Sequence, residues 1–424
     1  MFSTHALDHS TATRPGAYIP ELDGIRAIAV LMVLMLHILE PDQQSSAALL
    51  TVAPRALAIL IGHGWLGEDL FFVLSGFLIT GILLDHPDNL ENFYARRALR
   101  ILPLYLLCIA IMAGFYSGNA SYFLLSLVFL ANIAGPLGIP VPHGPGVFWS
   151  LAVEEHFYLI WPWLVRALSR RALACTCASI IIAEPILRAV FVARGIDVYN
   201  PSWFRFDSLA SGALLAIWFR SPLASQRRSL LAAGISLATA FAITIAGLPF
   251  GILAKTVAGM SLRSNQATLL YCAGMLVAVT CRSTRLTAPL RWRYARLTGE
   301  LSYCLYLIHL ALFDGYMLVF RHFVPTGITF AQLLLRALVV LAASYGLALL
   351  SRRFFERPIL SLKRYLTPKP LRGAGAFACE PVDMALCRKP PSAAGWPAKS
   401  KLPEFELSPP HSGSDSDVFR RPKR

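Results

Sequence analysis

Long apolar stretches separated by short polar segments run through the first 366 residues. A helix that crosses a membrane needs roughly 20 consecutive apolar residues, and many of these stretches approach that length. Apolar stretches of this kind predict an all-α fold, a polytopic bundle of transmembrane helices. The eleven stretches are residues 22–40, 66–84, 101–117, 121–139, 148–166, 172–193, 206–219, 229–248, 266–281, 301–321 and 330–351.

The stretch at 121–139 differs from the others. If it crossed the membrane, Arg166, Arg170 and Arg171 would lie opposite the other strong basic clusters, against the positive-inside rule. The stretch also runs into glycines and prolines between residues 135 and 146, which interrupt a helix. We therefore predict a re-entrant or interfacial segment here, about ten transmembrane helices in total, and both termini in the cytoplasm.

Composition supports a membrane protein and excludes an ordinary soluble globule. Hydrophobic residues make up 56% of the chain, charged residues 15%, and the mean hydropathy is +0.56. The net charge of +15 comes from Arg and Lys clusters between apolar stretches, which is typical of membrane topology and not of nucleic-acid binding. The eight cysteines have neither disulfide nor metal-site spacing, so we expect no metal and no tightly bound cofactor.

These patterns predict that the chain has three parts. Residues 1–17 form an N-terminal arm that we expect to be disordered, and residues 18–366 form the membrane domain. In residues 367–424 Pro, Ser, Lys and Arg replace the large apolar residues, which predicts a disordered, basic cytoplasmic tail. We expect a multi-pass protein of a bacterial inner membrane.

Ionisable residues inside the predicted spans are costly, so each marks a candidate functional site. With a rise of about 1.5 Å per residue across roughly 30 Å of hydrocarbon, His37 lies about 9 Å below the outer face. Four spans carry such groups in the outer third of the membrane, which predicts one shared polar pocket. These groups are His37, Glu68, Asp69, Glu154, Glu155, Arg205 and Asp207.

This combination of groups suits acid–base chemistry at a hydroxyl. A histidine can take the proton of an acceptor hydroxyl, and a carboxylate can fix its tautomer and stabilise the imidazolium. We therefore predict that His37 is a general base with a carboxylate partner, which is one of the carboxylates at this depth. The alternative is that each of these residues only caps a helix or lies at the membrane interface.

Arginines mark the cytoplasmic side of the same bundle. Arg26 precedes His37 by eleven residues, close to three helical turns, so both project from one face of the first span and could line one tunnel. Arg96, Arg97 and Arg100 lie directly before another span, where guanidinium groups suit phosphate recognition. Positive-inside anchoring is the alternative for this cluster.

Three further polar residues share one face of the span that begins at Leu301. Ser302, Tyr306 and His309 follow helical spacing, and a stripe of hydroxyls and an imidazole can line a polar passage. Hydrogen bonding between helices is the alternative, and for Ser302 and Tyr306 we favour it.

Seven motifs in order resemble acyltransferase family 3, a family of integral membrane O-acyltransferases that includes bacterial O-antigen and other polysaccharide O-acetylases and macrolide acylases. The resemblance spans about residues 18–360. The motifs are Tyr18-Ile-Pro-Glu21-Leu-Asp23-Gly24-Ile-Arg26 leading to His37, Gly67-Glu-Asp69-Leu-Phe-Phe-Val-Leu-Ser75-Gly76-Phe77, Arg96-Arg97-Ala-Leu-Arg100-Ile-Leu-Pro103-Leu-Tyr105, Phe148-Trp149-Ser150-Leu-Ala-Val-Glu154-Glu155-His156-Phe157-Tyr158, Arg205-Phe-Asp207, Ser302-Tyr303-Cys-Leu-Tyr306-Leu-Ile-His309 and Phe355-Glu356-Arg-Pro358.

The resemblance implies roles for several of these residues. An Arg and a His in the first span serve acyl transfer, which matches Arg26 and His37, and the basic triplet matches Arg96, Arg97 and Arg100 near the acyl-CoA. It places Asp69, Glu154 and Glu155 around the histidine. Glu68 departs from the family pattern, which has an apolar residue there, and so it adds a carboxylate that could partner His37.

The resulting hypothesis is a membrane O-acyltransferase that moves an acyl group, acetyl by default, from acetyl-CoA or another acyl-CoA to a hydroxyl of a glycan or glycolipid acceptor. Arg205 could stabilise the developing oxyanion. Trp149, Asp207, Ser302, Tyr306 and His309 would line the acceptor site or the tunnel. Direct transfer and relay through an acyl-enzyme at His37 or His309 both stay open, as do the acceptor, the acyl length and the oligomeric state. The alternative function is a multi-pass transporter or polysaccharide-export protein, for which inverted repeats or paired broken helices are not evident.

Overall fold

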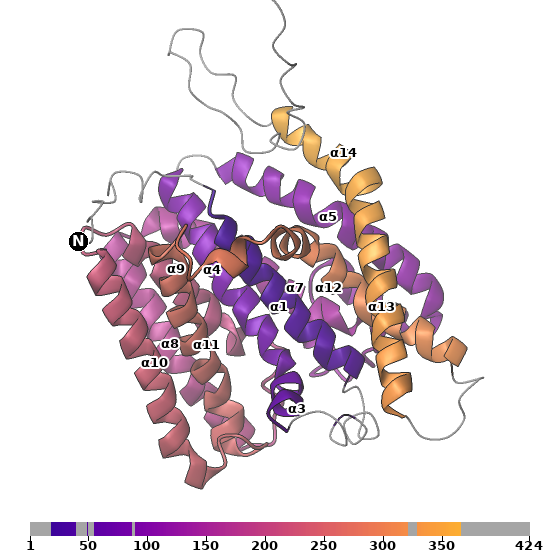
Figure 1. The fold of residues 1–424 in the computed structure, drawn as a ribbon, viewed down its shortest axis with the longest axis horizontal. Coiled ribbons are helices and arrows are strands. Elements are labelled where there is room, and N and C mark those ends of the chain that lie inside the picture. The colour runs from indigo at the N-terminus through magenta and orange to yellow at the C-terminus, as the bar shows by residue number, and fades with distance from the viewer. Residues whose placement is uncertain (1–17, 40–48, 50–54, 87–89, 321–328, 366–424) are drawn as a thin grey trace, which may run out of the picture. The chain divides into compact units, whose positions relative to one another are not determined.

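The computed structural model describes residues 18–39, 49, 55–86, 90–320 and 329–365, and all regular elements within these ranges are helices. The predicted arm (1–17) and tail (367–424) lie outside the described residues. The longer helices, drawn in Figure 1, are α1 (Pro20–Leu39), α4 (Gly67–Asp85), α5 (Leu90–Phe115), α7 (Phe148–Ala167), α8 (Arg170–Val192), α9 (Phe206–Phe219), α10 (Gln226–Gly247), α11 (Val257–Thr280), α12 (Arg293–Phe320) and α13 (Phe330–Ser351).

Shorter helices connect the long ones. Most are single 3₁₀ turns, and η9 is a π-helical turn that continues α13. They are α3 (Arg55–Gly62), η2 (Gly64–Leu66), η3 (Ser117–Asn119), α6 (Ala120–Leu127), η4 (Ala131–Ile133), η5 (Gly144–Val147), η6 (Ser202–Phe204), η7 (Leu248–Phe250), η8 (Ala288–Arg291), η9 (Arg352–Glu356), α14 (Arg357–Leu360) and η10 (Ser361–Tyr365).

The all-α, multi-pass architecture is confirmed. By length and composition, seven helical segments of the described chain can cross a membrane: Pro20–Leu39, Gly64–Asp85, Leu90–Phe115, Arg170–Val192, Gln226–Phe250, Arg293–Val319 and Phe330–Tyr365. Helix α9 is apolar but only 14 residues long, and α7 and α11 are not among the seven. The count of about ten spans and the cytoplasmic position of the termini stay predictions.

The stretch at 121–139 forms no long helix. It contains the eight-residue α6, about 12 Å long, followed by the single turn η4. This length is too short to cross the hydrocarbon core, as the glycines and prolines that follow it indicate. The Tyr105 hydroxyl donates to the Ser126 carbonyl at 2.8 Å, which satisfies a backbone group where the helix breaks off.

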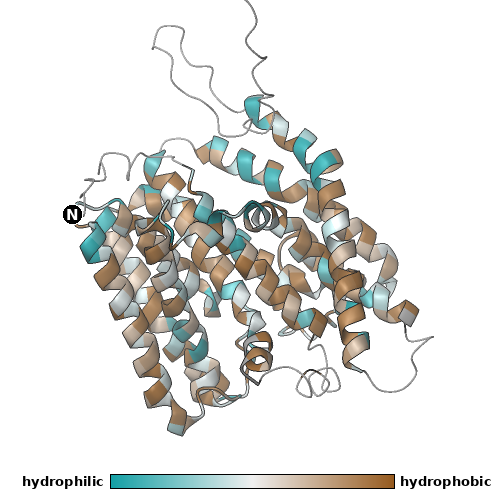
Figure 2. Cartoon of the chain, in the orientation of Figure 1, coloured by the Kyte–Doolittle hydropathy of each residue, from teal (hydrophilic) through white to brown (hydrophobic). Residues whose placement is uncertain are grey.

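Hydrophilic residues gather at one end of the helices. Figure 2 shows this end where α5 and α10 begin and α13 ends, and these termini carry the basic clusters that the sequence analysis placed on a single side. The flanks of α10 and α13 are largely hydrophobic in the same view. Such a distribution is typical of a bundle with an apolar belt that faces lipid.

Small residues bring α4 and α9 into close contact. A Cβ added to Gly76 would lie 1.9 Å from the Leu209 carbonyl oxygen, and one added to Gly212 would lie 1.9 Å from that of Val73. Glycines at such crossings let two membrane helices approach backbone to backbone, where van der Waals contact replaces the missing hydrophobic drive. This contact holds the start of α4, with Glu68 and Asp69, against the start of α9.

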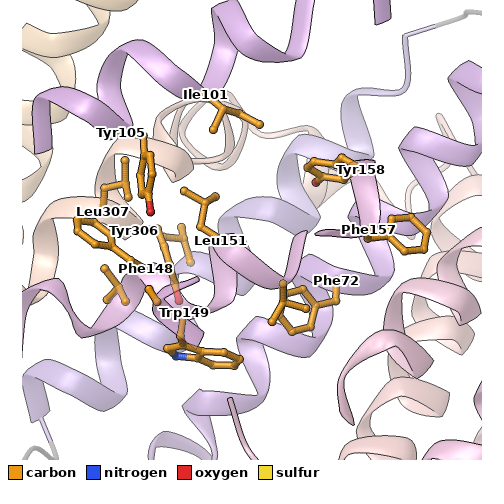
Figure 3. Close-up of a cluster of buried hydrophobic side chains, with 14 of the residues drawn as sticks. Phe72, Ile101, Tyr105, Phe148, Trp149, Leu151, Phe157, Tyr158, Tyr306 and Leu307 are labelled. Carbon is orange, nitrogen blue, oxygen red and sulfur yellow. The ribbon is translucent and has the colours of Figure 1, made fainter. Parts of the chain in front are cut away.

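Buried aromatic rings pack together between α4, α5, α7 and α12. Figure 3 shows Phe72, Tyr105, Phe148 and Trp149 in one cluster with Tyr306. Tyr105 packs against Phe148 with ring centroids 5.2 Å apart. Ring packing of this density fixes the rotation of α7 and α12, and hence the direction of the polar side chains that they carry.

Candidate active site

Two histidines from helices far apart in sequence form a pair. His37, near the end of α1, lies with Nδ1 3.1 Å from Nε2 of His309 in α12, and the ring centroids are 5.2 Å apart. His309 is completely buried, and α1 packs along α12. The sequence analysis had assigned His309 to a tunnel or a relay, and the structure brings it directly to His37.

Backbone contacts determine the tautomer of this pair. His309 Nδ1 lies 2.8 Å from the Tyr306 carbonyl oxygen, which can only accept, so Nδ1 carries the proton. In the neutral ring Nε2 is then an acceptor, and His37 Nδ1 must donate to it. The second nitrogen of His37, Nε2, is therefore the basic one.

We predicted a carboxylate as the partner of His37, and in the described residues the partner is His309 instead. Among the described residues, none of Glu68, Asp69, Glu154 and Glu155 forms an ion pair with His37, and the first three have other polar partners. Glu154 accepts from Ser75 Oγ at 3.0 Å and from the Tyr158 hydroxyl at 2.7 Å. Glu155 Oε1 is buried and has no hydrogen-bond partner among the residues that the structure describes. An imidazole takes the place that we had given to a carboxylate.

Glu68 lies between two tyrosines. The Tyr306 hydroxyl donates to Oε1 at 3.0 Å and the Tyr199 hydroxyl to Oε2 at 2.9 Å, and Ser150 Oγ lies 2.6 Å from the same Tyr306 hydroxyl. Burial, and after it the neighbouring Glu68 carboxylate, raises the pKa of Tyr199 well above its ordinary value, so that its phenol remains a donor. Tyr306 thus joins two polar groups: its hydroxyl holds Glu68 and its carbonyl holds His309.

Arg205 and Asp69 form a buried ion pair. Arg205 Nη2 lies 3.0 Å from Asp69 Oδ1, and both side chains are at most 3% exposed. The guanidinium carbon lies 5.1 Å from the ring centroid of Tyr199 and 5.5 Å from those of Phe72 and Trp149. Aromatic faces and a carboxylate together compensate a desolvated guanidinium, which would otherwise cost several kcal/mol.

A second buried cluster involves two residues that the sequence analysis missed. Arg188 donates to Asp207 Oδ2 at 2.6 Å and to the Phe204 carbonyl at 2.6 Å. Glu184 accepts from the backbone N–H groups of Phe206 and Asp207 at 2.9 and 2.8 Å, and so it caps α9 from the neighbouring helix α8. The signal in the sequence was an acidic and a basic residue four apart within the apolar stretch 172–193. Asp207 therefore belongs to this cluster with Arg188 and Glu184.

A large cavity lies between α1, α4, α5, α7 and α12. It encloses about 1010 Å³ of empty space, part of it open to the surroundings. Arg26, Arg97 and Arg100 line it, and so do Glu68, Ser150 and Tyr306. In the predicted topology the arginines mark its cytoplasmic part and the other three residues its outer part. Between them lie mostly apolar side chains from α4 and α5, which suit a long, flexible ligand.

The predicted residues divide into those that line this cavity and those that do not. The lining includes Arg26, Arg97, Arg100, Glu154, Ser302 and Tyr306. The residues outside its described lining are Arg96, His37, Asp69, Trp149, Glu155, Arg205, Asp207 and His309. Arg26 thus lies on the wall of this cavity and His37 does not, so a tunnel lined by both residues is not what the structure shows.

Another polar group contains His143, Asp314 and Tyr116. His143, in the loop before α7, places Nδ1 2.6 Å from Asp314 Oδ1, and the Tyr116 hydroxyl donates to the other oxygen of Asp314. Asp314 follows His309 by five residues on α12. The sequence analysis did not select these residues, although a carboxylate inside the apolar stretch 301–321 was a usable signal.

The family comparison agrees with this arrangement. The family model for the acyltransferase 3 type, described as an acyltransferase domain, matches residues 19–353. This protein belongs to acyltransferase family 3. The matched range includes every site residue described above, and an acyltransferase assignment does not support the transporter alternative.

Curated relatives of this family member include three bacterial proteins. YrhL of Bacillus subtilis is 30% identical over 339 residues, 70% of this chain and 49% of that protein. The peptidoglycan O-acetyltransferase OatA of Listeria monocytogenes is 27% identical, covering 81% of this chain and 56% of that protein, and the O-acetyltransferase OatA of Staphylococcus aureus (strain NCTC 8325) is 26% identical, covering 81% and 57%. The chain thus spans about half the length of the curated relatives it matches. No solved structure matches this member of acyltransferase family 3.

Proposed function

We propose that this protein transfers an acyl group, with acetyl as the simplest case, from an acyl-CoA to a hydroxyl of a sugar-containing acceptor such as a surface polysaccharide. The observation that carries the proposal is the cavity with arginines in one part and Glu68, Ser150 and Tyr306 in the other, within a chain of acyltransferase family 3. The names of the relatives, which describe O-acetyltransferases, support a glycan acceptor. The bacterial inner membrane is the proposed location.

The acyl-CoA is proposed to occupy this cavity with its phosphates at the arginines. Arg97 lies with its guanidinium carbon 3.8 Å from the Tyr158 ring centroid, and its buried Nε has no hydrogen-bond partner among the described residues. A guanidinium held on a ring face with a free donor is prepared for a phosphate oxygen. The apolar middle of the cavity would then accommodate the pantetheine arm.

His37 is the proposed general base. Its Nε2 takes the proton of the acceptor hydroxyl while the oxygen attacks the thioester carbonyl carbon. The C–S bond then breaks, and the CoA thiolate leaves and receives that proton. His309 stabilises the imidazolium, because the hydrogen bond from His37 Nδ1 becomes charge-assisted when His37 is protonated. An acyl-enzyme at one of the two histidines is the alternative course, and trapping a labelled acyl group on the protein would support it.

The arginine triplet offers a test with a built-in control. Replacing Arg97 by Gln is expected to raise KM for acetyl-CoA by roughly tenfold with little change in kcat, because a phosphate contact is lost in ground and transition state alike. Arg96→Gln removes the same charge from the same helix outside the described cavity lining, so it is expected to leave KM within about twofold. Initial rates in proteoliposomes check both. Equal effects of the two variants would indicate bulk charge and contradict a phosphate site.

The overall function is tested by transfer of radiolabelled acetyl into the glycan fraction of whole cells. We expect labelling above that of cells without the protein, and CoA release from acetyl-CoA by the purified protein when an acceptor is present. If neither occurs with correctly folded protein, the proposed activity is wrong.

A further inference from the structure

A second cavity lies next to the first, in the predicted topology on its outer side. It encloses about 840 Å³ of empty space, part of it open to the surroundings. Its lining comes from η2, α8, the loop before η6, the residue between η6 and α9, and the start of α11 with the segment before it. The residues that matter below are Trp65, Tyr199, Arg205, Lys255, Arg263 and Ser264.

The charges on this lining have one sign. Its ionisable side chains, within the described part of the chain, are the cations Lys255, Arg263, Arg205 and Arg188 together with the phenol of Tyr199, and no carboxylate is among them. The nearby carboxylates Asp69 and Asp207 are outside this described lining and form the ion pairs described above. Asp69 and Asp207 therefore neutralise Arg205 and Arg188. Lys255 and Arg263 form no ion pair within the described residues. The cavity presents net positive charge to a ligand.

Two buried donors in this lining lack a partner. Arg205 is only 2% exposed, and its Nε has no hydrogen-bond partner within the ranges that the structure covers. The same holds for the buried Nε of Arg263, whose guanidinium carbon lies 4.7 Å from the Trp65 ring centroid. Unsatisfied donors of this kind are costly, and a ligand that accepts hydrogen bonds would remove the cost.

Aromatic rings add apolar surface to this lining. Trp65 and Tyr199 meet edge to face with centroids 5.9 Å apart, and Trp149, outside the described lining, packs against Tyr199 with centroids 5.0 Å apart. The C–H face of a sugar ring packs well on such surfaces, while its hydroxyls bond to polar groups at the rim. Cations and aromatic rings in one cavity therefore fit a saccharide that carries negative charge.

The two cavities share one wall. Glu68 lines the first cavity and accepts a hydrogen bond from Tyr199, which lines the second. Trp65 follows Gly64, and a Cβ added to Gly64 would lie 2.8 Å from Cβ of Leu36, the residue before His37. The second cavity thus borders both the proposed acyl-donor site and the end of α1 that carries the proposed base.

We propose that this second cavity binds the acceptor, and that the acceptor is an anionic saccharide with a phosphate or carboxylate group held by Lys255 and Arg263. The inference rests on the proposed acyl transfer for its biological meaning, but its binding test does not depend on transfer. Arg205 and Tyr199 would contact the sugar, and Tyr199, which donates to Glu68, would hold it at the wall that the two cavities share.

Calorimetric titration of the protein in nanodiscs, without acetyl-CoA, tests the site. The probes are tetragalacturonate against neutral cellotetraose, and glucose 1-phosphate against glucose, so that the two pairs distinguish carboxylate from phosphate. At least one charged probe is expected to bind roughly tenfold more tightly than its neutral match. The preference is expected to disappear in the double variant Lys255→Gln, Arg263→Gln and to persist in Arg194→Gln, an exposed cation outside this cavity.

Folding is controlled by Arg263→Lys, which keeps the charge and is expected to keep most of the preference. Equal binding of charged and neutral probes, or an unchanged preference in the double variant, would overturn the proposal. Inorganic phosphate that binds as tightly as glucose 1-phosphate would overturn the saccharide part. If the protein prefers the charged probes but transfers no acetyl group, the anion site is supported and the proposed activity is wrong. If it transfers acetyl but shows no such preference, the activity is supported and the anion site is wrong.

Discussion

His37→Ala is expected to lower acyl transfer by roughly 100- to 10,000-fold, the range for loss of a general base, at unchanged membrane expression. The reason is that Nε2 of His37 is the nitrogen left basic by the hydrogen bond to His309. KM for acetyl-CoA is expected to change little, because His37 lies outside the described cavity lining. The measurement is the initial rate of acetyl transfer and of CoA release in proteoliposomes.

Two further variants make this prediction specific. His63→Ala removes a histidine near the end of α3 whose ring bonds only the Ile59 carbonyl among the described groups, and it is expected to retain activity. His309→Ala is expected to reduce kcat less than His37→Ala does, because it removes the group that orients the base and leaves the base itself. Wild-type rates for His37→Ala would contradict the assignment. Glu68→Gln would then test the carboxylate that lines the cavity.

Gly212→Ala is expected to destabilise the folded protein strongly. Its new Cβ would lie 1.9 Å from the Val73 carbonyl oxygen, and a backbone atom cannot move aside as a flexible side chain can. Helices α4 and α9 would have to separate, at a cost at or above the roughly 1–3 kcal/mol typical of overpacking. Ser208 would lose its 3.1 Å hydrogen bond to Asp69 as they did so. Gly76→Ala, at the reciprocal position, is expected to behave alike.

The control for both variants is Gly234→Ala in α10. A Cβ there meets no atom of the described residues within 4 Å, so this change removes a glycine from a helix without creating a contact with them. Thermal unfolding in detergent, followed by size-exclusion chromatography, is expected to show a lower midpoint and less monodisperse protein for Gly212→Ala and Gly76→Ala, and an unchanged or higher midpoint for Gly234→Ala. Equal midpoints for all three would contradict the proposed backbone contact between α4 and α9.

Hydropathy predicted the helices better than their ends. The stretch 101–117 became α5, which begins at Leu90, and 266–281 became α11, which begins at Val257. Both helices extend into polar sequence that no apolar stretch reveals. In α5 the early turns carry the arginines of the cavity, and in α11 they carry Ser264 and Asn265, which bond to Arg205 and Arg188. Helix propensity and tertiary contacts stabilise these helices in the polar segments outside the apolar stretches.

Depth in the membrane grouped these polar residues but could not assign their partners. Glu68, Asp69 and Arg205 do lie together, as the depth argument predicted. The partner of His37 was wrong, because helical rotation decides which of several groups at one depth face each other. A residue's distance along its own helix carries no information about the rotation of the neighbouring helix.

The amino-acid pattern was enough to establish a multi-pass helical membrane protein, the broken segment at 121–139 and, through seven motifs, membership of acyltransferase family 3. Each of these depends on properties of single residues or of short segments, which do not change with the packing. The pairing of His37 with His309 across 272 positions, the binding of Glu68 by two tyrosines and the existence of two adjacent cavities depend on which helix faces meet. Those contacts result from ring packing and glycine crossings between distant helices, so they exist only after the whole bundle has assembled.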